Sequence, residues 1–182
     1  MRRFSGKIFP AGCQNSYTGV KQATLCLLIR PACAGRENEI LLAMKKRGFG
    51  VGKWNGAGGK LDAKRGDKNI FDAAIRETKE EIGVSIIDPE KVGIFHFRFS
   101  HKPEWDQDVH LFLVKNWQGD PQESEEMAPK WFPFEEIPYQ SMWPDDIYWL
   151  PHVLKGNKVE ADFLFGDEDK ISDYKVRIVD GL

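Results

Sequence analysis

The chain has 182 residues, of which 41% are hydrophobic and 30% are charged. This length and composition are typical of one globular domain, and no apolar run approaches the roughly 18 residues of a membrane span. The 26 Lys and Arg residues are balanced by 28 Asp and Glu residues, which gives a net charge of -2. This balance excludes the strongly basic surface of a protein that coats nucleic acid polymers, but it leaves small anionic ligands open.

Residues 1–20 are predicted to form a flexible extension. They contain arginines and no acidic residue, a composition that is also typical of a mitochondrial presequence. Gly6, Pro10 and Gly12 interrupt any amphipathic helix there, which favours an ordinary tail over a targeting signal. The three cysteines of the chain include no CxxC pair, which argues against a disulfide framework or a zinc site and indicates a reducing compartment.

The rest of the chain, residues 21–182, is predicted to form one α+β domain. A hairpin with its loop at 32–38 is expected first, and a loop with six glycines follows at 48–59. The best helix candidate is 69–82, because Asp67 or Asn69 can cap its start and Gly83 can end it. The remaining predictions are strands at 24–29, 39–44, 92–99, 109–114, 130–134, 163–165 and 175–179, and a second helix at 144–155.

The predicted helix at 69–82 carries three glutamates on one side. At about 100° per residue, Glu77, Glu80 and Glu81 fall within an arc of roughly 100°. Such carboxylates repel one another, and a divalent cation that prefers oxygen ligands, Mg²⁺ or Mn²⁺, offsets the repulsion. A solvated helix face with Arg76 and Lys79 as ion-pair partners is the simpler alternative. The glycine-rich loop just before the helix favours the metal site, because its carbonyls add ligands and its N–H groups can approach phosphate.

The same helix matches a family motif. Gly59, followed by 76–77, 80–81 and 83–84 (Arg-Glu, Glu-Glu and Gly-Val), resembles the Nudix box, G-x5-E-x7-R-E-U-x-E-E-x-G-U with U aliphatic. The resemblance implies a Nudix fold, in which a mixed β-sheet is packed between α-helices.

Three features of this chain depart from the Nudix pattern. The interval from Gly59 to Arg76 is 17 residues where the motif has 14, which indicates an insertion of three residues near 63–66. Asp67 or Lys68 occupies the place of the motif's first glutamate, which usually has a structural role. Thr78 stands where an aliphatic residue is usual.

Further segments resemble the Nudix hydrolases that act on oxidised purine nucleoside triphosphates. These segments are 44–50, 54–60, 123–127, 143–146 and 173–174. The resemblance implies a Mg²⁺-dependent enzyme, with Mn²⁺ as a substitute. It would convert 8-oxo-dGTP, 2-hydroxy-dATP and related modified purine nucleotides to the monophosphate and pyrophosphate, and so clean the nucleotide pool.

The resemblance also implies a catalytic and metal-binding set. The carbonyl of Gly58 and the carboxylates of Glu77, Glu80, Glu81 and Glu126 would hold the metal, and Arg76 would lock neighbouring carboxylates in place. Glu77 and Glu126 are both candidates for the general base.

Substrate-binding residues follow from the resemblance as well. They are Thr24, Lys45, Asn55, Ala57, Gly58, Gly59, Lys60, Phe97, Met127, Trp143, Pro144, Asp145, Asp146 and Trp149. The two lysines would add positive charge at the phosphates, with ordinary solvent exposure as the alternative. The aromatic members and Met127 would line the purine pocket, with ordinary core packing as the alternative. Ala57 stands where the family has an aromatic residue, which predicts a wider pocket or a shifted selectivity.

Asp145 and Asp146 are adjacent acids beside Trp143. Two poorly solvated carboxylates do not both stay ionised cheaply, so we expect the pair to keep one proton. A neutral carboxyl donates as well as accepts, and such a pair fits the N7–H donor and O6 acceptor of 8-oxoguanine. Moving the proton between the two acids would let the same pocket accept a different oxidised purine.

Two alternatives stay open at this stage: a Nudix diphosphatase for another nucleotide substrate, and a nucleotide-binding module without turnover. The segment 143–146 favours a purine reader over the first, and the full set of glutamates favours turnover over the second. We expect a small-molecule nucleotide as the partner, with no nucleic acid polymer and no membrane. We further expect a monomer in the cytoplasm, with the mitochondrial or nuclear nucleotide pool as the alternative location.

Overall fold

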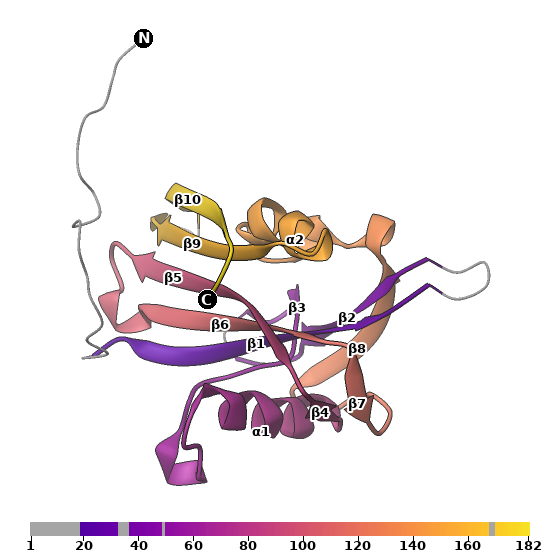
Figure 1. Cartoon of the computed structure of the whole chain (residues 1–182). Helices are drawn as coiled ribbons and strands as arrows, with labels where there is room; N and C mark the ends of the chain where they lie inside the picture. The colour runs from indigo at the N-terminus through magenta and orange to yellow at the C-terminus, as the bar shows by residue number, and fades with distance from the viewer. Residues whose placement is uncertain (1–18, 33–36, 49, 168–169) are drawn as a thin grey trace.

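The computed structural model describes residues 19–32, 37–48, 50–167 and 170–182. The predicted extension at 1–20 therefore lies almost wholly outside the described residues, as does most of the predicted hairpin loop. The described chain forms an eight-stranded mixed sheet, a two-stranded sheet and two α-helices. Figure 1 shows the large sheet between α1 (Ile70–Ile82) and α2 (Asp146–Leu154), one on each face, which is the predicted α+β architecture. Neither of these helices is long and apolar enough to cross a membrane.

The large sheet has the strand order β10-β9-β5-β6-β1-β2-β3. The eighth strand, β8, pairs with β2 along the edge of β2 that faces away from β1. The strands of this sheet are β1 (Lys21–Arg30), β2 (Glu39–Lys45), β3 (Trp54–Asn55), β5 (Glu90–Phe99), β6 (Gln107–Val114), β8 (Met127–Pro133), β9 (Lys158–Phe165) and β10 (Ile171–Val179). The pairs β1–β6 and β5–β9 are parallel, and the other pairs are antiparallel.

Several short elements escaped the sequence prediction. The second sheet pairs β4 (Ser85–Ile87) with β7 (Asn116–Gln118), and β3 is only two residues long. The described residues also form the 3₁₀ turns η1 (Ala63–Arg65), η2 (Pro103–Trp105), η3 (Phe134–Glu136) and η4 (Tyr139–Ser141). Pairing across the sheet defines these strands, because two or three residues are too short to show a hydrophobic period.

The sheet separates two hydrophobic cores, and β1 contributes side chains to both of them. Leu25 and Leu27 pack in one core with Trp149 of α2, whereas Cys26 and Leu28 pack in the other core against α1. Successive side chains of a strand point to opposite faces, so a strand covered on both sides is apolar throughout. This is why residues 24–29 read as a continuous apolar run in the sequence.

The strand β1 changes its neighbour half-way along. Its last residues, Leu28–Arg30, pair with β2. Before that point, the N–H groups of Thr24 and Cys26 donate to the carbonyls of Gly59 and Ala57 at 2.8 and 2.7 Å. The glycine-rich loop therefore takes the place of a strand beside the first half of β1, and this fixes the backbone of the loop next to α1.

Candidate active site

The caps of α1 fix where its glutamates lie. The Asn69 side chain accepts hydrogen bonds from two N–H groups of the first turn, and Gly83 ends the helix with φ of 80°. Thr78 is fully buried, and its hydroxyl donates to the carbonyl of Ala74 at 2.7 Å. The polar group of this residue is thereby satisfied inside the core, which explains why a threonine is tolerated at this position.

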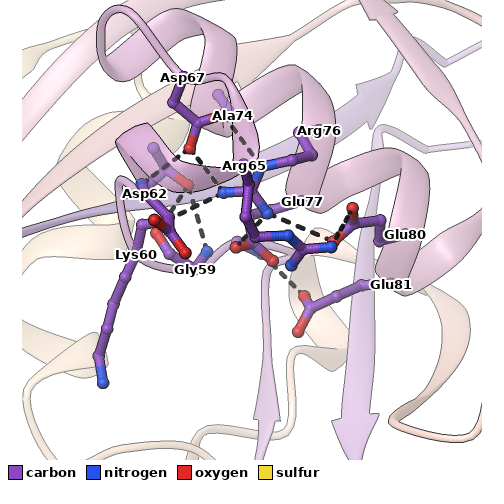
Figure 2. A network of polar contacts seen from close by, with 12 residues as sticks. Gly59, Lys60, Asp62, Arg65, Asp67, Ala74, Arg76, Glu77, Glu80 and Glu81 are labelled. Carbon is purple, nitrogen blue, oxygen red and sulfur yellow. Dashed lines mark hydrogen bonds and ion pairs between the residues drawn. The ribbon is translucent and has the colours of Figure 1, made fainter.

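Arg76 binds the carboxylates around it (Figure 2). Its Nε and Nη2 donate to the buried Asp67 at 2.9 and 2.7 Å. Its Nη1 donates to Glu77 at 2.7 Å and to Glu80 at 3.3 Å. The hydrogen bonds from Arg76 hold the pKa of Asp67 below its usual value. Of the two residues left open by the sequence, Asp67 and not Lys68 therefore makes the structural contact.

Each glutamate of the predicted metal set faces a cation. Besides the contact of Glu77 with Arg76, Glu80 pairs with Arg65 at 2.6 Å. Lys45 Nζ lies 3.0 Å from Glu81 and 3.2 Å from Glu126. The second oxygen of Glu126 pairs with Arg47 at 2.9 Å. A cavity of about 450 Å³ is lined by Arg47, Arg65, Glu77, Glu80, Glu81, Ser124, Glu125 and Glu126.

The electrostatic environment differs among these groups. Burial raises the pKa of Glu81, although the N–H of Gly58 at 2.9 Å and Lys45 both favour its carboxylate. Partial burial works against the charge of Lys45, but Glu81 and Glu126 outweigh it and raise the pKa of this lysine. Hydrogen bonds from Arg47 and Lys45 lower the pKa of Glu126. The surroundings of the more exposed Glu126 thus favour its ionised form more strongly than those of the buried Glu81.

Two glycines let the loop approach both β1 and α1. A Cβ on Gly58 would lie 2.1 Å from the carbonyl oxygen of Thr24, and a Cβ on Gly59 would lie 2.5 Å from Cδ of Glu77. Only glycine fits at such distances. The close approach leaves the Gly58 N–H 2.9 Å from Glu81 and packs the Glu77 side chain against the loop.

A second, larger cavity of about 600 Å³ adjoins the carboxylates. The sheet contributes Phe95, Phe97 and Phe99 from alternate positions of β5, and Trp143 and Trp149 belong to the lining as well. Arg47, Glu81 and Glu126 line both cavities. An apolar, aromatic chamber therefore borders an acidic one, an arrangement that suits a ligand with a flat ring at one end and a charged group at the other.

The two acids of the aromatic chamber are almost fully buried. Asp145 is 4% exposed and accepts from Nε1 of Trp149 at 3.0 Å, and Asp146 is 2% exposed and accepts from the N–H of Trp143 at 2.9 Å. Burial raises the pKa of both carboxyls, and the charge of Asp145 raises that of Asp146 further. Lys53 partly offsets this effect. The pair therefore favours retention of a proton near neutral pH.

Comparison with known proteins agrees with this geometry. The NUDIX domain model matches residues 21–153. The chain belongs to the Nudix family. It is 45% identical over 159 residues to the oxidized purine nucleoside triphosphate hydrolase of Mus musculus, covering 87% of this chain and 96% of the mouse protein. The protein of the same name from Danio rerio is 42% identical, over 89% of this chain and 97% of that protein.

Solved structures confirm the Nudix fold. The MutT protein of Bacillus halodurans superposes with a TM-score of 0.71, covering 86% of this chain and 97% of that one. The sequence identity of the two chains is 22%, so this likeness speaks for the fold alone.

Most of the residues predicted to bind a Nudix substrate gather around the larger cavity. These are Thr24, Lys45, Asn55, Gly58, Gly59, Lys60, Phe97, Met127, Trp143, Asp145, Asp146 and Trp149. Ala57 and Pro144 do not line it. Ala57 packs instead in the core on the α1 side of the sheet, and Pro144 is exposed. The prediction that Ala57 widens the base pocket was therefore wrong, because the alternation of side chains along the loop turns its methyl group to the other face.

The structure adds residues that the sequence analysis missed. Arg47, Lys53 and Gln107 line the larger cavity, and Arg47 and Arg65 line the smaller one. Arg47 belongs to the basic run before the glycine-rich loop, which was a usable signal. The other three belong to no motif recognised in the sequence, and only the packing of distant segments brings them to the site.

The donor set of the smaller cavity fits a hard divalent cation. Its carboxylate oxygens are the ligand type that Mg²⁺ and Mn²⁺ prefer. Within the described ranges, no three His, Cys, Asp or Glu side chains converge as a ready metal-binding group. The partners of the four glutamates are instead Lys and Arg side chains, which a cation would have to replace.

Proposed function

We propose that this Nudix protein is a nucleoside triphosphate diphosphatase that hydrolyses oxidised purine nucleotides. The substrates would be 8-oxo-dGTP, 2-hydroxy-dATP and related modified purines, and the products the monophosphate and pyrophosphate. The observation that carries this proposal is that the two cavities adjoin each other, with Arg47, Glu81 and Glu126 in the lining of both. The names of the mouse and zebrafish relatives support the same substrate class.

The acidic cavity would hold the divalent cation. We assign the carboxylates of Glu77, Glu80, Glu81 and Glu126, with the carbonyl of Gly58, as its ligands, and Mg²⁺ as the ion, with Mn²⁺ as a substitute. When bound, such a cation neutralises phosphate charge and lowers the pKa of a coordinated water.

The protein's own groups would do the rest. Lys45, Arg47 and Lys60 line the larger cavity near the carboxylates, so their charges favour the phosphates of a nucleotide. Glu77 or Glu126 would accept the proton of the attacking water. Arg76 acts as a positioning residue, because its guanidinium holds Glu77 and Glu80 while Asp67 holds the guanidinium.

The aromatic cavity would select the base. Trp143, Phe97 and Trp149 offer flat surfaces against a purine, and the amide of Asn55 lies at the same cavity. An 8-oxopurine carries an N7–H donor where the normal base has an acceptor. Asp145 and Asp146, with one retained proton between them, can accept from that donor and donate to O6. A shift of the proton would fit 2-hydroxyadenine in the same cavity.

The proposal extends to the setting in which the protein acts. We infer that residues 21–182 function as a monomeric domain in the cytoplasm, behind a flexible extension at 1–20. Its partner would be a free nucleotide, without a nucleic acid polymer or a membrane. Hydrolysis there would remove damaged precursors before a polymerase uses them.

Pyrophosphate release tests this function. In the presence of Mg²⁺, we expect turnover of 8-oxo-dGTP and 2-hydroxy-dATP with kcat/KM at least about tenfold above that for dGTP, since one well-placed hydrogen bond supplies such a factor. Glu80→Gln removes the charge of one proposed metal ligand, so the turnover of this variant should fall. Equal values of kcat/KM for dGTP and for the oxidised nucleotides would contradict the assigned specificity. Tight binding of the oxidised nucleotides without pyrophosphate release would instead identify a binding module.

A further inference from the structure

The three-residue insertion in the Nudix box forms a fixed turn rather than a loose loop. Its residues make up η1, and Asp62 caps the turn by accepting from the N–H of Lys64 at 2.9 Å. Gly66 closes the turn with φ of 97°. The N–H of Asp62 donates to Asp67 at 2.9 Å, which ties the turn to the carboxylate that also holds Arg76. The insertion therefore has a defined position next to the acidic cavity.

The turn delivers one guanidinium to that cavity. Nη2 of Arg65 donates to Glu80 at 2.6 Å, and Arg65 belongs to the lining of the acidic cavity. Figure 2 shows the Arg65 side chain reaching across the face of α1 toward Glu80. Arg65, which belongs to the insertion and has no counterpart in the motif, thus contacts a predicted metal ligand.

Arg65 and Arg76 hold Glu80 in different ways. The Arg76 side chain is 14% exposed and donates to two other carboxylates and a backbone carbonyl. The Arg65 side chain is 50% exposed, and among the described residues it forms its ion pair and hydrogen bond with Glu80. An exposed guanidinium with one ion pair exchanges partners at low cost, whereas a buried one with several partners does not.

The charges that line the acidic cavity indicate that a phosphate group could be a second partner for Arg65. Five glutamates and two arginines line it. A divalent cation on Glu80 would remove the need for Arg65 there, while an incoming polyphosphate would bring new negative charge to the same space. The planar fork of a guanidinium matches phosphate oxygens with two hydrogen bonds.

Resting on the proposed function, we propose that Arg65 exchanges Glu80 for a phosphate oxygen of the nucleotide when a divalent cation occupies the site. In the free enzyme, Arg65 neutralises Glu80 and competes with the cation. In the loaded enzyme, it binds the phosphate end of the substrate. The insertion thereby adds a phosphate-binding residue to the Nudix box of this chain.

The exchange predicts opposite effects of one substitution on two affinities. Arg65→Gln should bind Mn²⁺ alone about twofold to fivefold more tightly than the unmodified protein, because a half-exposed ion pair no longer competes. The same variant should bind inorganic pyrophosphate in the presence of Mg²⁺ about tenfold more weakly, because a charge-assisted pair of hydrogen bonds is lost. Electron paramagnetic resonance of free Mn²⁺ measures the first affinity, and calorimetry with pyrophosphate measures the second.

Lys64→Gln provides the matched control. It removes an equal charge from the same turn, and Lys64 does not line either cavity. Both of its affinities should equal those of the unmodified protein. If either affinity of Arg65→Gln is unchanged, or if Lys64→Gln reproduces both effects, the exchange is overturned. These equilibrium measurements need no turnover, so a failure to hydrolyse oxidised nucleotides would count against the proposed function and not against the exchange.

Discussion

Removing the carboxylate of Asp67 should destabilise the protein and impair its site together. The Asp67 side chain is 3% exposed and that of Arg76 is 14% exposed, so the pair is largely desolvated. Asp67→Ala deletes the acceptor of two Arg76 donors, at 2.9 and 2.7 Å, and of the Asp62 N–H. Breaking a buried ion pair costs about 3–5 kcal/mol. We expect a value near the lower end, about 3 kcal/mol, because Arg76 keeps Glu77 as a partner.

Urea unfolding and thermal melting measure this loss. For a domain of this size, about 3 kcal/mol corresponds to a decrease in Tm of roughly 6–12 °C. Asp67→Asn keeps one oxygen acceptor but loses the charge, so its loss in the free energy of unfolding should be about half as large. Since Arg76 positions two of the predicted metal ligands, kcat/KM of Asp67→Ala should also fall by about tenfold to a hundredfold.

Asp72→Asn is the control for this experiment. Asp72 also lies near the start of α1, and its carboxylate accepts only from the N–H of Lys68 at 2.9 Å. Its amide can keep that bond, so the loss in the free energy of unfolding should stay under about 1 kcal/mol. Equal losses for Asp67→Ala and Asp72→Asn would refute the role assigned to the buried pair.

Four further substitutions test the site and the core. Asp145→Asn removes a carboxyl from the base-reading pair, so the ratio of kcat/KM for 8-oxo-dGTP over dGTP should fall by about tenfold, and an unchanged ratio would count against that pair. Gly59→Ala adds a Cβ 2.5 Å from a flexible carboxylate, that of Glu77, so pyrophosphate release should fall by at least about a hundredfold while Tm changes little. Gly58→Ala adds a Cβ 2.1 Å from a backbone oxygen of β1, so its Tm should fall as well, and equal Tm values for the two glycine variants would refute the assigned contacts. Burial lowers the pKa of His110 to about 4, so the unfolded chain takes up the proton first as the pH falls below about 6.5. The free energy of unfolding should therefore contain a contribution from this residue that decreases by about 2 kcal/mol from pH 7 to pH 5, and urea titrations of His110→Gln should lack it.

The tautomer of His110 explains the sign of this pH effect. Gln22 uses its amide nitrogen to donate to Asp108, so its oxygen is the acceptor for Nε2 of His110 at 2.7 Å. Nδ1 of His110 is buried and has no hydrogen-bond partner among the described groups. Protonation would place an unpaired N–H and a charge in the interior, so the folded state favours the neutral ring.

Local sequence was enough to define α1 and its chemistry. Gly83 ends the helix as predicted, Asn69 rather than Asp67 caps its start, and Ala74, Thr78 and Ile82 are buried on one face. These features depend on hydrogen bonds and side-chain periods within one turn or two, so the sequence contains all the information needed. The sequence likewise predicted part of each long strand, although it found only the last three residues of β9 and left the pairing of the strands open.

The tertiary structure decided which of the candidate residues share a cavity. Ala57 and Gly58 are neighbours in the sequence, yet one packs in the core and the other reaches the carboxylates, because the hydrogen bonds of the loop to β1 set which face each residue takes. Arg47 pairs with Glu126 and Arg65 pairs with Glu80, so two segments on opposite sides of the glycine-rich loop meet at the same acidic cavity. A sequence pattern reports the preferences of neighbours along the chain, whereas a binding site depends on the register and packing of distant segments. That is why the motif identified the chemistry of this protein, and only the fold determined which cations and aromatic side chains surround it.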